Sequence, residues 1–86
     1  MCTDSTEHVP AAGSGKGPGG WFRLSEVSVY YDHPAHALAD HTLNLDFINP
    51  AQGPSARVAV ELTAQTARDL ARAIESALAA VPPGSA

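Results

Sequence analysis

The feature that most constrains the fold is a change of apolar period at Thr63. Residues 56–62 alternate apolar and polar side chains, as in a strand whose two faces meet different surroundings. From residue 63 to residue 81 the apolar side chains recur at intervals of three and four, which makes one stripe along a helix. Thr63 suits the helix N-cap, and Pro82 stops the helix because proline cannot continue it. A strand that runs directly into an amphipathic helix needs other segments to cover its apolar face.

Two upstream segments are predicted to be strands. One spans residues 27–31, and the other, residues 41–48, alternates apolar with polar side chains. Short connections between consecutive strands favour an antiparallel meander. The predicted fold is therefore α+β: a three-stranded antiparallel meander with one C-terminal helix, packed on the face that carries Val29, Leu45 and Val60.

Length and glycine content define the domain organisation. The chain has 86 residues and is predicted to hold one domain, over residues 21–81. Residues 1–20 are expected to be a flexible, glycine-rich N-terminal arm, and residues 82–86 a disordered tail. Trp21 and Phe22, which follow the arm, are expected to anchor the core because large aromatic side chains supply apolar area.

Small size also predicts self-association. A folded part of roughly 60 residues is marginal for a single core, so we expect a homodimer. The outer face of the predicted sheet is polar, yet Tyr30, Ile48 and Ala59 form an apolar centre at which two copies can pair symmetrically.

Charge and hydropathy argue against two classes of partner. The formal net charge is −4 with only five Lys and Arg, which gives no basic surface for nucleic acid or for an anionic membrane. No apolar run approaches the roughly 20 residues of a membrane span, and the polar, acidic N-terminal sequence differs from a secretory signal. A single cysteine excludes an internal disulfide. We therefore expect a cytoplasmic protein that binds neither nucleic acid nor membrane.

The connection from residue 32 to residue 41 carries the side chains best suited to metal binding or acid–base chemistry. It holds three of the four histidines and two aspartates. A meander brings this connection to the sheet edge at which the helix begins, where unpaired amides favour anions and keep an imidazole neutral. We therefore expect a small-molecule ligand at this edge. The candidate ligand-binding residues are Tyr31, Asp32, Thr63, Gln65 and Thr66.

Three interpretations of this connection stay open. In the first, the three histidines bind a divalent metal such as zinc or iron, Asp32, Asp40 or Cys2 completes the shell, and a position is left open for catalysis. The candidate metal ligands are His33, His36, His41 and Cys2. In the second, one histidine oriented by Asp32 moves a proton on a bound metabolite. In the third, the histidines are loop residues without a chemical role.

Five stretches of the chain resemble a group of small actinobacterial proteins of unknown function. The stretches are Gly13 to Gly17, Gly20 to Phe22, Asp32 to Pro34, His41 to Phe47 and Arg57 to Leu62. The resemblance covers most of the chain and implies no activity. The sequence thus predicts a small cytoplasmic, self-associating binding module with a ligand or divalent-metal site at the connection 33–41. The alternative is a small metal-dependent or histidine acid–base enzyme that acts on a metabolite.

Overall fold

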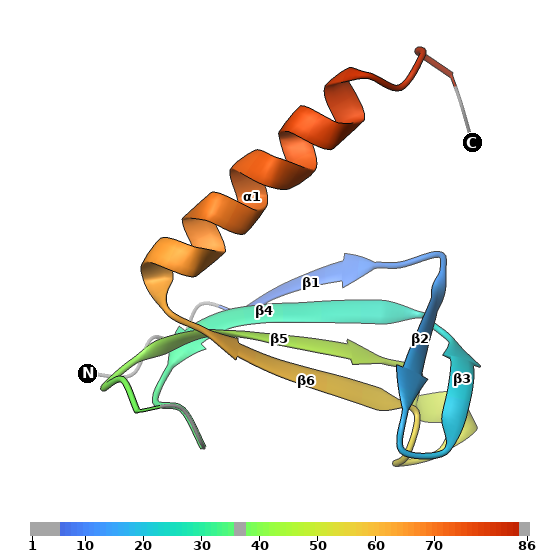
Figure 1. Ribbon diagram of the computed structural model, residues 1–86. Coiled ribbons are helices and arrows are strands. Elements are labelled where there is room, and N and C mark those ends of the chain that lie inside the picture. The colour runs from blue at the N-terminus through green and yellow to red at the C-terminus, as the bar shows by residue number, and fades with distance from the viewer. Residues whose placement is uncertain (1–5, 36–37, 85–86) are drawn as a thin grey trace.

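The protein is a twisted antiparallel sheet with a small hairpin at one end and a helix that rises from the other end (Figure 1). The computed structural model describes residues 6–35 and 38–84. Within these residues the elements are β1 Thr6–Pro10, β2 Ser14–Gly17, β3 Gly20–Arg23, β4 Glu26–Asp32, β5 Thr42–Ile48, the 3-10 helix η1 Pro50–Gln52, β6 Arg57–Leu62 and α1 Ala64–Ala79. The larger sheet has the strand order β1-β4-β5-β6, and β2 pairs with β3 in a separate two-stranded sheet.

The predicted α+β class is confirmed, and the expected meander forms the centre of the larger sheet. Strands β4, β5 and β6 pair antiparallel in sequence order, with Val29 opposite Leu45 and Leu45 opposite Val60. These three side chains share one face because the pleat alternates side chains and the register aligns the strands. Local alternation in the sequence was therefore sufficient to identify these three strands.

The three-stranded sheet that we expected is simpler than the observed fold. Residues 6–10 form β1, which extends the sheet beyond β4, and residues 14–23 form the β2–β3 hairpin. Glycine-rich composition favours a flexible arm, yet Gly13 and Gly20 take positive φ angles, which only glycine adopts readily, at the ends of these strands. The first part of the chain thus belongs to the folded structure from residue 6 onward.

The expectation that Trp21 is a core anchor is wrong. Its side chain is 72% exposed, whereas Phe22 next to it is half-buried. Successive residues of a strand point to opposite faces, so only one of two adjacent aromatic side chains can face the interior. In β3 that side chain is Phe22.

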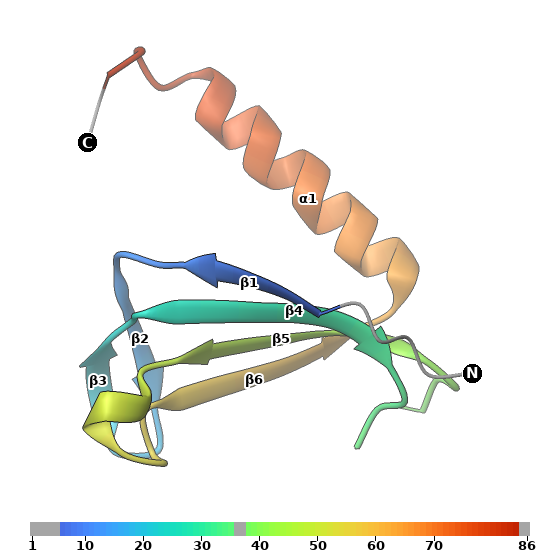
Figure 2. The ribbon, with the colours of Figure 1, turned by 180° about the vertical axis from the view of Figure 1, so that it is seen from behind.

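The helix begins as predicted but does not lie across the sheet. Thr63 is the N-cap, and its Oγ1 accepts a hydrogen bond from the backbone N–H of Thr66 at 3.2 Å. Figures 1 and 2 show α1 leaving the end of β6 at a slant, so that its C-terminal turns stand clear of the sheet. Contacts between α1 and the sheet are mainly with β5 and β6. The predicted packing of the helix on one face therefore holds for its first turns only.

Candidate functional site

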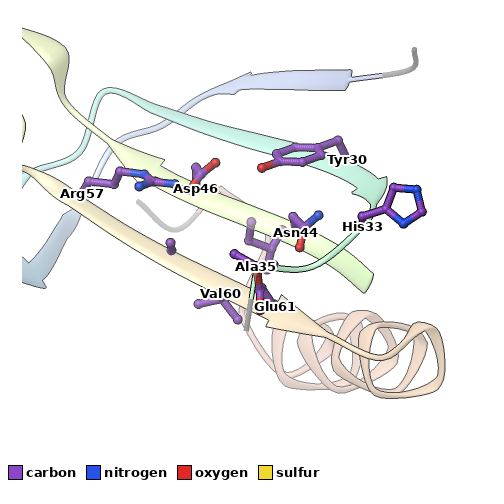
Figure 3. Close-up of a pocket in the computed structure, with 10 residues that line it drawn as sticks. Tyr30, His33, Ala35, Asn44, Asp46, Arg57, Val60 and Glu61 are labelled. Carbon is purple, nitrogen blue, oxygen red and sulfur yellow. Dashed lines mark hydrogen bonds and ion pairs between the residues drawn. The ribbon is translucent and has the colours of Figure 1, made fainter. Parts of the chain in front are cut away.

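A polar cleft lies on the face of the sheet that is turned away from the helix (Figure 3). Its volume is about 590 Å³, and it spans strands β4, β5 and β6 together with the segment that follows β4. It is lined by Tyr30, His33, Ala35, Asn44, Leu45, Asp46, Arg57, Ala59, Val60 and Glu61. We call this surface the polar cleft.

An ion pair between neighbouring strands lines the polar cleft, toward the end opposite His33 (Figure 3). Arg57 donates to Asp46 Oδ1 from Nη2 at 2.7 Å and from Nε at 3.1 Å. Tyr30 lies beside this pair, and its phenol has a raised pKa, first because of partial burial and second because of the Asp46 carboxylate. The neutral phenol therefore persists above the ordinary tyrosine range and acts as a hydrogen-bonding group.

Part of this polar face is buried more deeply than the apolar face. Thr42 is fully buried, and its Oγ1 donates to Asn44 Oδ1 at 2.8 Å, so two polar side chains satisfy each other inside the sheet. Ser28 is also buried, and its Oγ donates to Glu26 Oε2 at 3.1 Å. Every buried side-chain polar atom of the described residues has a hydrogen-bond partner. These bonds fix the positions of the buried polar side chains on this face of the sheet.

The segment after β4 forms one end of the cleft. The backbone N–H of Ala35 donates to the carboxylate of Glu61 on β6, which holds the segment over the outer face. Asp32 Oδ1 accepts from the backbone N–H of His33 at 2.7 Å. As a result, His33 stands at the rim of the polar cleft (Figure 3).

Two of the candidate histidines come together at this rim. The ring centroids of His33 and His41 lie 4.5 Å apart, and the His41 ring stacks on Tyr31 at 5.7 Å. His33 Nδ1 lies 3.2 Å from the carbonyl oxygen of Asp40. A carbonyl only accepts, so Nδ1 carries the proton and Nε2 of a neutral His33 keeps its lone pair for a ligand.

The other two candidate metal ligands, Cys2 and His36, lie outside the described residues. Among the residues that are described, no group of three or more His, Cys, Asp or Glu side chains is placed to hold a metal ion. The described part of the chain therefore supplies the histidine pair of His33 and His41 and no third ligand.

The candidate ligand-binding residues separate into two groups. Tyr31 borders a pocket of about 360 Å³ together with the first turns of α1, so the strand end and the helix start lie side by side as expected. The helix residues are used within the helix: Thr63 Oγ1 donates to Thr66 Oγ1 at 3.0 Å, and Gln65 Nε2 donates to Asp69 Oδ1 at 3.0 Å. The sequence predicts Thr63 as the helix N-cap, but it does not predict the side-chain bonds that Thr63 and Gln65 donate within the helix.

The cleft residues on the strands themselves were not predicted to form a site. The sequence predicts Tyr30, Asp46 and Arg57 on the outer face of the sheet, with Tyr30 at the centre of a dimer contact and Asp46 and Arg57 on the polar surface around it. Their alternation with apolar residues was the available signal. Only the register, which sets Ile48 opposite Arg57 and Asp46 opposite Ala59, brings the ion pair together.

The fold and the cleft define a small α+β protein with an open, polar cleft on one face of a sheet. The chain belongs to a family of unknown function, DUF6295, whose match covers residues 1–86. Comparison with curated proteins and with solved structures found no match. Within the described residues, the helix is too short and too polar to cross a membrane.

Proposed function

We propose that this protein is a small binding module that takes a polar small molecule in the polar cleft. The observation that carries the proposal is the Arg57–Asp46 ion pair in the lining of a cleft of about 590 Å³. Side chains held on paired strands are more precisely placed than side chains on loops. The cleft has the volume of a small-molecule site, which lies at about 300–1,000 Å³ in proteins.

The lining of the cleft indicates the chemistry of the ligand. Arg57 offers guanidinium donors, while Tyr30 and Asn44 can each donate and accept hydrogen bonds. His33 adds an imidazole at the rim. This set favours an uncharged or zwitterionic metabolite with both donors and acceptors over a purely apolar molecule.

The test is a screen of polar metabolites by amide chemical-shift perturbation of the ¹⁵N-labelled full chain. A ligand of the polar cleft should shift amides of β4, β5 and β6, and Arg57→Gln should weaken its binding by about tenfold. Arg72→Gln is the matched control, because Arg72 also pairs with an aspartate, Asp69, but lies on the helix away from the cleft. Equal losses in both variants, or shifts confined to α1, would contradict the proposal.

A second candidate function is divalent-metal binding at the histidine pair. The hydrogen bond from His33 Nδ1 to the Asp40 carbonyl favours it, because metal-bound histidines commonly orient their second nitrogen in this way. The two imidazoles would hold zinc or iron, which could act as a Lewis acid. Cys2 and His36 are the proposed additional ligands of this metal site. The cytoplasmic location of the protein also stays a prediction.

Elemental analysis of the untagged protein by plasma mass spectrometry tests this second function. Metal near one equivalent in the parent chain should be lost in both His33→Ala and His41→Ala. His8→Ala serves as the matched control, because His8 contacts Glu26 and Ser28 and does not belong to the histidine pair. A metal content equal in all four proteins, or a metal-free parent, would exclude the histidine pair as a metal site.

A further inference from the structure

We propose that the helix of a second copy of this chain covers the apolar groove between α1 and the sheet, giving a symmetric homodimer. The apolar groove has a volume of about 350 Å³ and is open to solvent. Leucine and isoleucine side chains of both elements line it, among them Leu43, Leu45 and Leu62 from the sheet and Leu70 and Ile74 from the helix. This surface is distinct from the polar cleft, which lies on the other face.

Within the described part of the chain, the apolar stripe of the helix is exposed over most of its length. Leu70 is 42% exposed, Ile74 is 49% exposed and Leu78 is 57% exposed. Exposure increases along α1 because the helix diverges from the sheet toward its C-terminal end (Figure 2). Leu78 lies beyond the residues that line the groove. A contiguous apolar stripe in water marks an interaction surface.

The face of the sheet toward the helix also carries apolar side chains that are incompletely buried. Its helix-facing side chains, such as Val29, Leu45 and Val60, are only half-buried, whereas the polar Thr42 and Asn44 on the other face are buried. Among the described residues, Ala56 is the only apolar residue that is buried, with 5% of its surface exposed. A chain that folds by burying apolar area needs a further surface against this face.

The shape of the chain indicates that the missing surface belongs to another molecule. The Cα radius of gyration is 14.3 Å, whereas a compact chain of 86 residues has about 12 Å. The excess fits the projecting helix seen in Figure 1. When two copies pair about a two-fold axis, the helix of each covers the groove of the other, so that both apolar surfaces are buried in one symmetric contact.

The charges of the two surfaces select a second copy as the occupant. The exposed side of α1 carries Arg68 and Arg72 against Asp69 and Glu75, so the helix is neutral overall. The groove is formed by aliphatic side chains with Arg68 at its border. A neutral helix with an apolar stripe can enter such a groove without leaving a charge buried and unpaired.

Sedimentation velocity of the full-length chain tests the dimer. The parent should sediment as a dimer, and Leu78→Glu should raise the dimer dissociation constant by about tenfold or more, because it places a carboxylate in the interface. Ser76→Glu is the matched control: it adds the same charge on the opposite side of α1 and should leave the constant within about twofold. Circular dichroism establishes that both variants keep their helix.

Mixed samples of labelled and unlabelled chain identify which surfaces meet. Isotope-filtered NOEs should connect the Leu78 methyl groups of one chain with Val29 or Leu45 methyl groups of the other. A parent that is monomeric at about 100 µM overturns the proposal. A dimer that is insensitive to Leu78→Glu also overturns it. So do NOEs that are all within one chain, which are expected if the helix closes onto its own sheet or if another partner fills the groove.

Discussion

Arg57 on β6 donates two hydrogen bonds to one carboxylate oxygen of Asp46 on β5, at 2.7 and 3.1 Å. The two residues are not directly opposite: Arg57 pairs with Ile48 and Asp46 pairs with Ala59, so the long guanidinium side chain reaches diagonally across the strands. Asp46 is 17% exposed, whereas Arg57 is 55% exposed. The carboxylate is therefore the more buried member of the pair, and it also raises the pKa of the neighbouring Tyr30 phenol.

Asp46→Asn should lower the free energy of unfolding by about 0.5–1 kcal/mol. The loss is modest because Arg57 is largely solvated and an exposed ion pair contributes little. Urea denaturation at one fixed protein concentration measures it, since oligomerisation would otherwise change the apparent stability. Arg72→Gln, which breaks the exposed Asp69–Arg72 pair on the helix, is the comparison and should cost less. A larger loss in the helix variant would contradict the importance assigned to Asp46.

Tyr30 should make stability fall at alkaline pH. Burial and the neighbouring Asp46 carboxylate raise the pKa of its phenol above 10, so the folded state holds the proton more tightly than the unfolded state. Stability is then complete below pH 10, which is the unfolded pKa, and is lost as the pH rises through the folded pKa. Alkaline urea titrations should show this slope in the parent and a weaker slope in Tyr30→Phe.

Absorbance at the tyrosinate band separates Tyr30 from Tyr31, the other tyrosine of the chain. The late-titrating phenol should disappear in Tyr30→Phe and remain in Tyr31→Phe. In Asp46→Asn its pKa should move down toward 10 while burial keeps part of the shift. A late phenol that survives Tyr30→Phe would mean that the shift belongs to the other residue.

Thr42→Val should cost about 1–2 kcal/mol in the free energy of unfolding. The two side chains have similar shapes, so packing is kept, but Asn44 loses the hydroxyl that donates to its Oδ1 in a buried position. Urea denaturation measures the loss. The double variant Thr42→Val/Asn44→Ala should be less destabilised than the sum of the single variants, because the unsatisfied amide is removed. Strict additivity would show that the bond contributes little.

The elements that the sequence predicted are those that depend on local patterns. Alternation identified β4, β5 and β6, and the hydroxyl of Thr63 identified the start of α1. The slant of the helix depends on long-range packing, which local patterns do not specify. The β2–β3 hairpin was missed because its glycine content favours a flexible arm, although glycine is also the residue that tight backbone approaches require.

The candidate site was predictable to a similar extent. His33 and His41 were expected near each other because they share one short connection, and their rings are close. The polar cleft was missed because the pairing of Asp46 with Arg57 depends on strand register and on side-chain reach. A shift of one residue in register would move one of these side chains to the other face.

Gly17→Ala should destabilise the protein, because β2 runs close to the backbone that enters β6. A Cβ at residue 17 would lie 2.7 Å from the carbonyl oxygen of Ser55 and 3.0 Å from that of Arg57, so the backbone itself must move. We expect a loss of about 1–3 kcal/mol, the usual cost of inserting a methyl group into a packed contact.

Gly15→Ala is the matched control in the same strand. Its Cβ would lie 3.4 Å from Leu24 Cδ2, a side-chain atom that can adjust, and alanine reduces the entropy that glycine loses on folding. The change should therefore stay within about 0.5 kcal/mol of the parent. Urea denaturation of the two variants measures the difference. Equal stability would mean that the hairpin does not pack on β6 in solution, because only that packing distinguishes the two glycines.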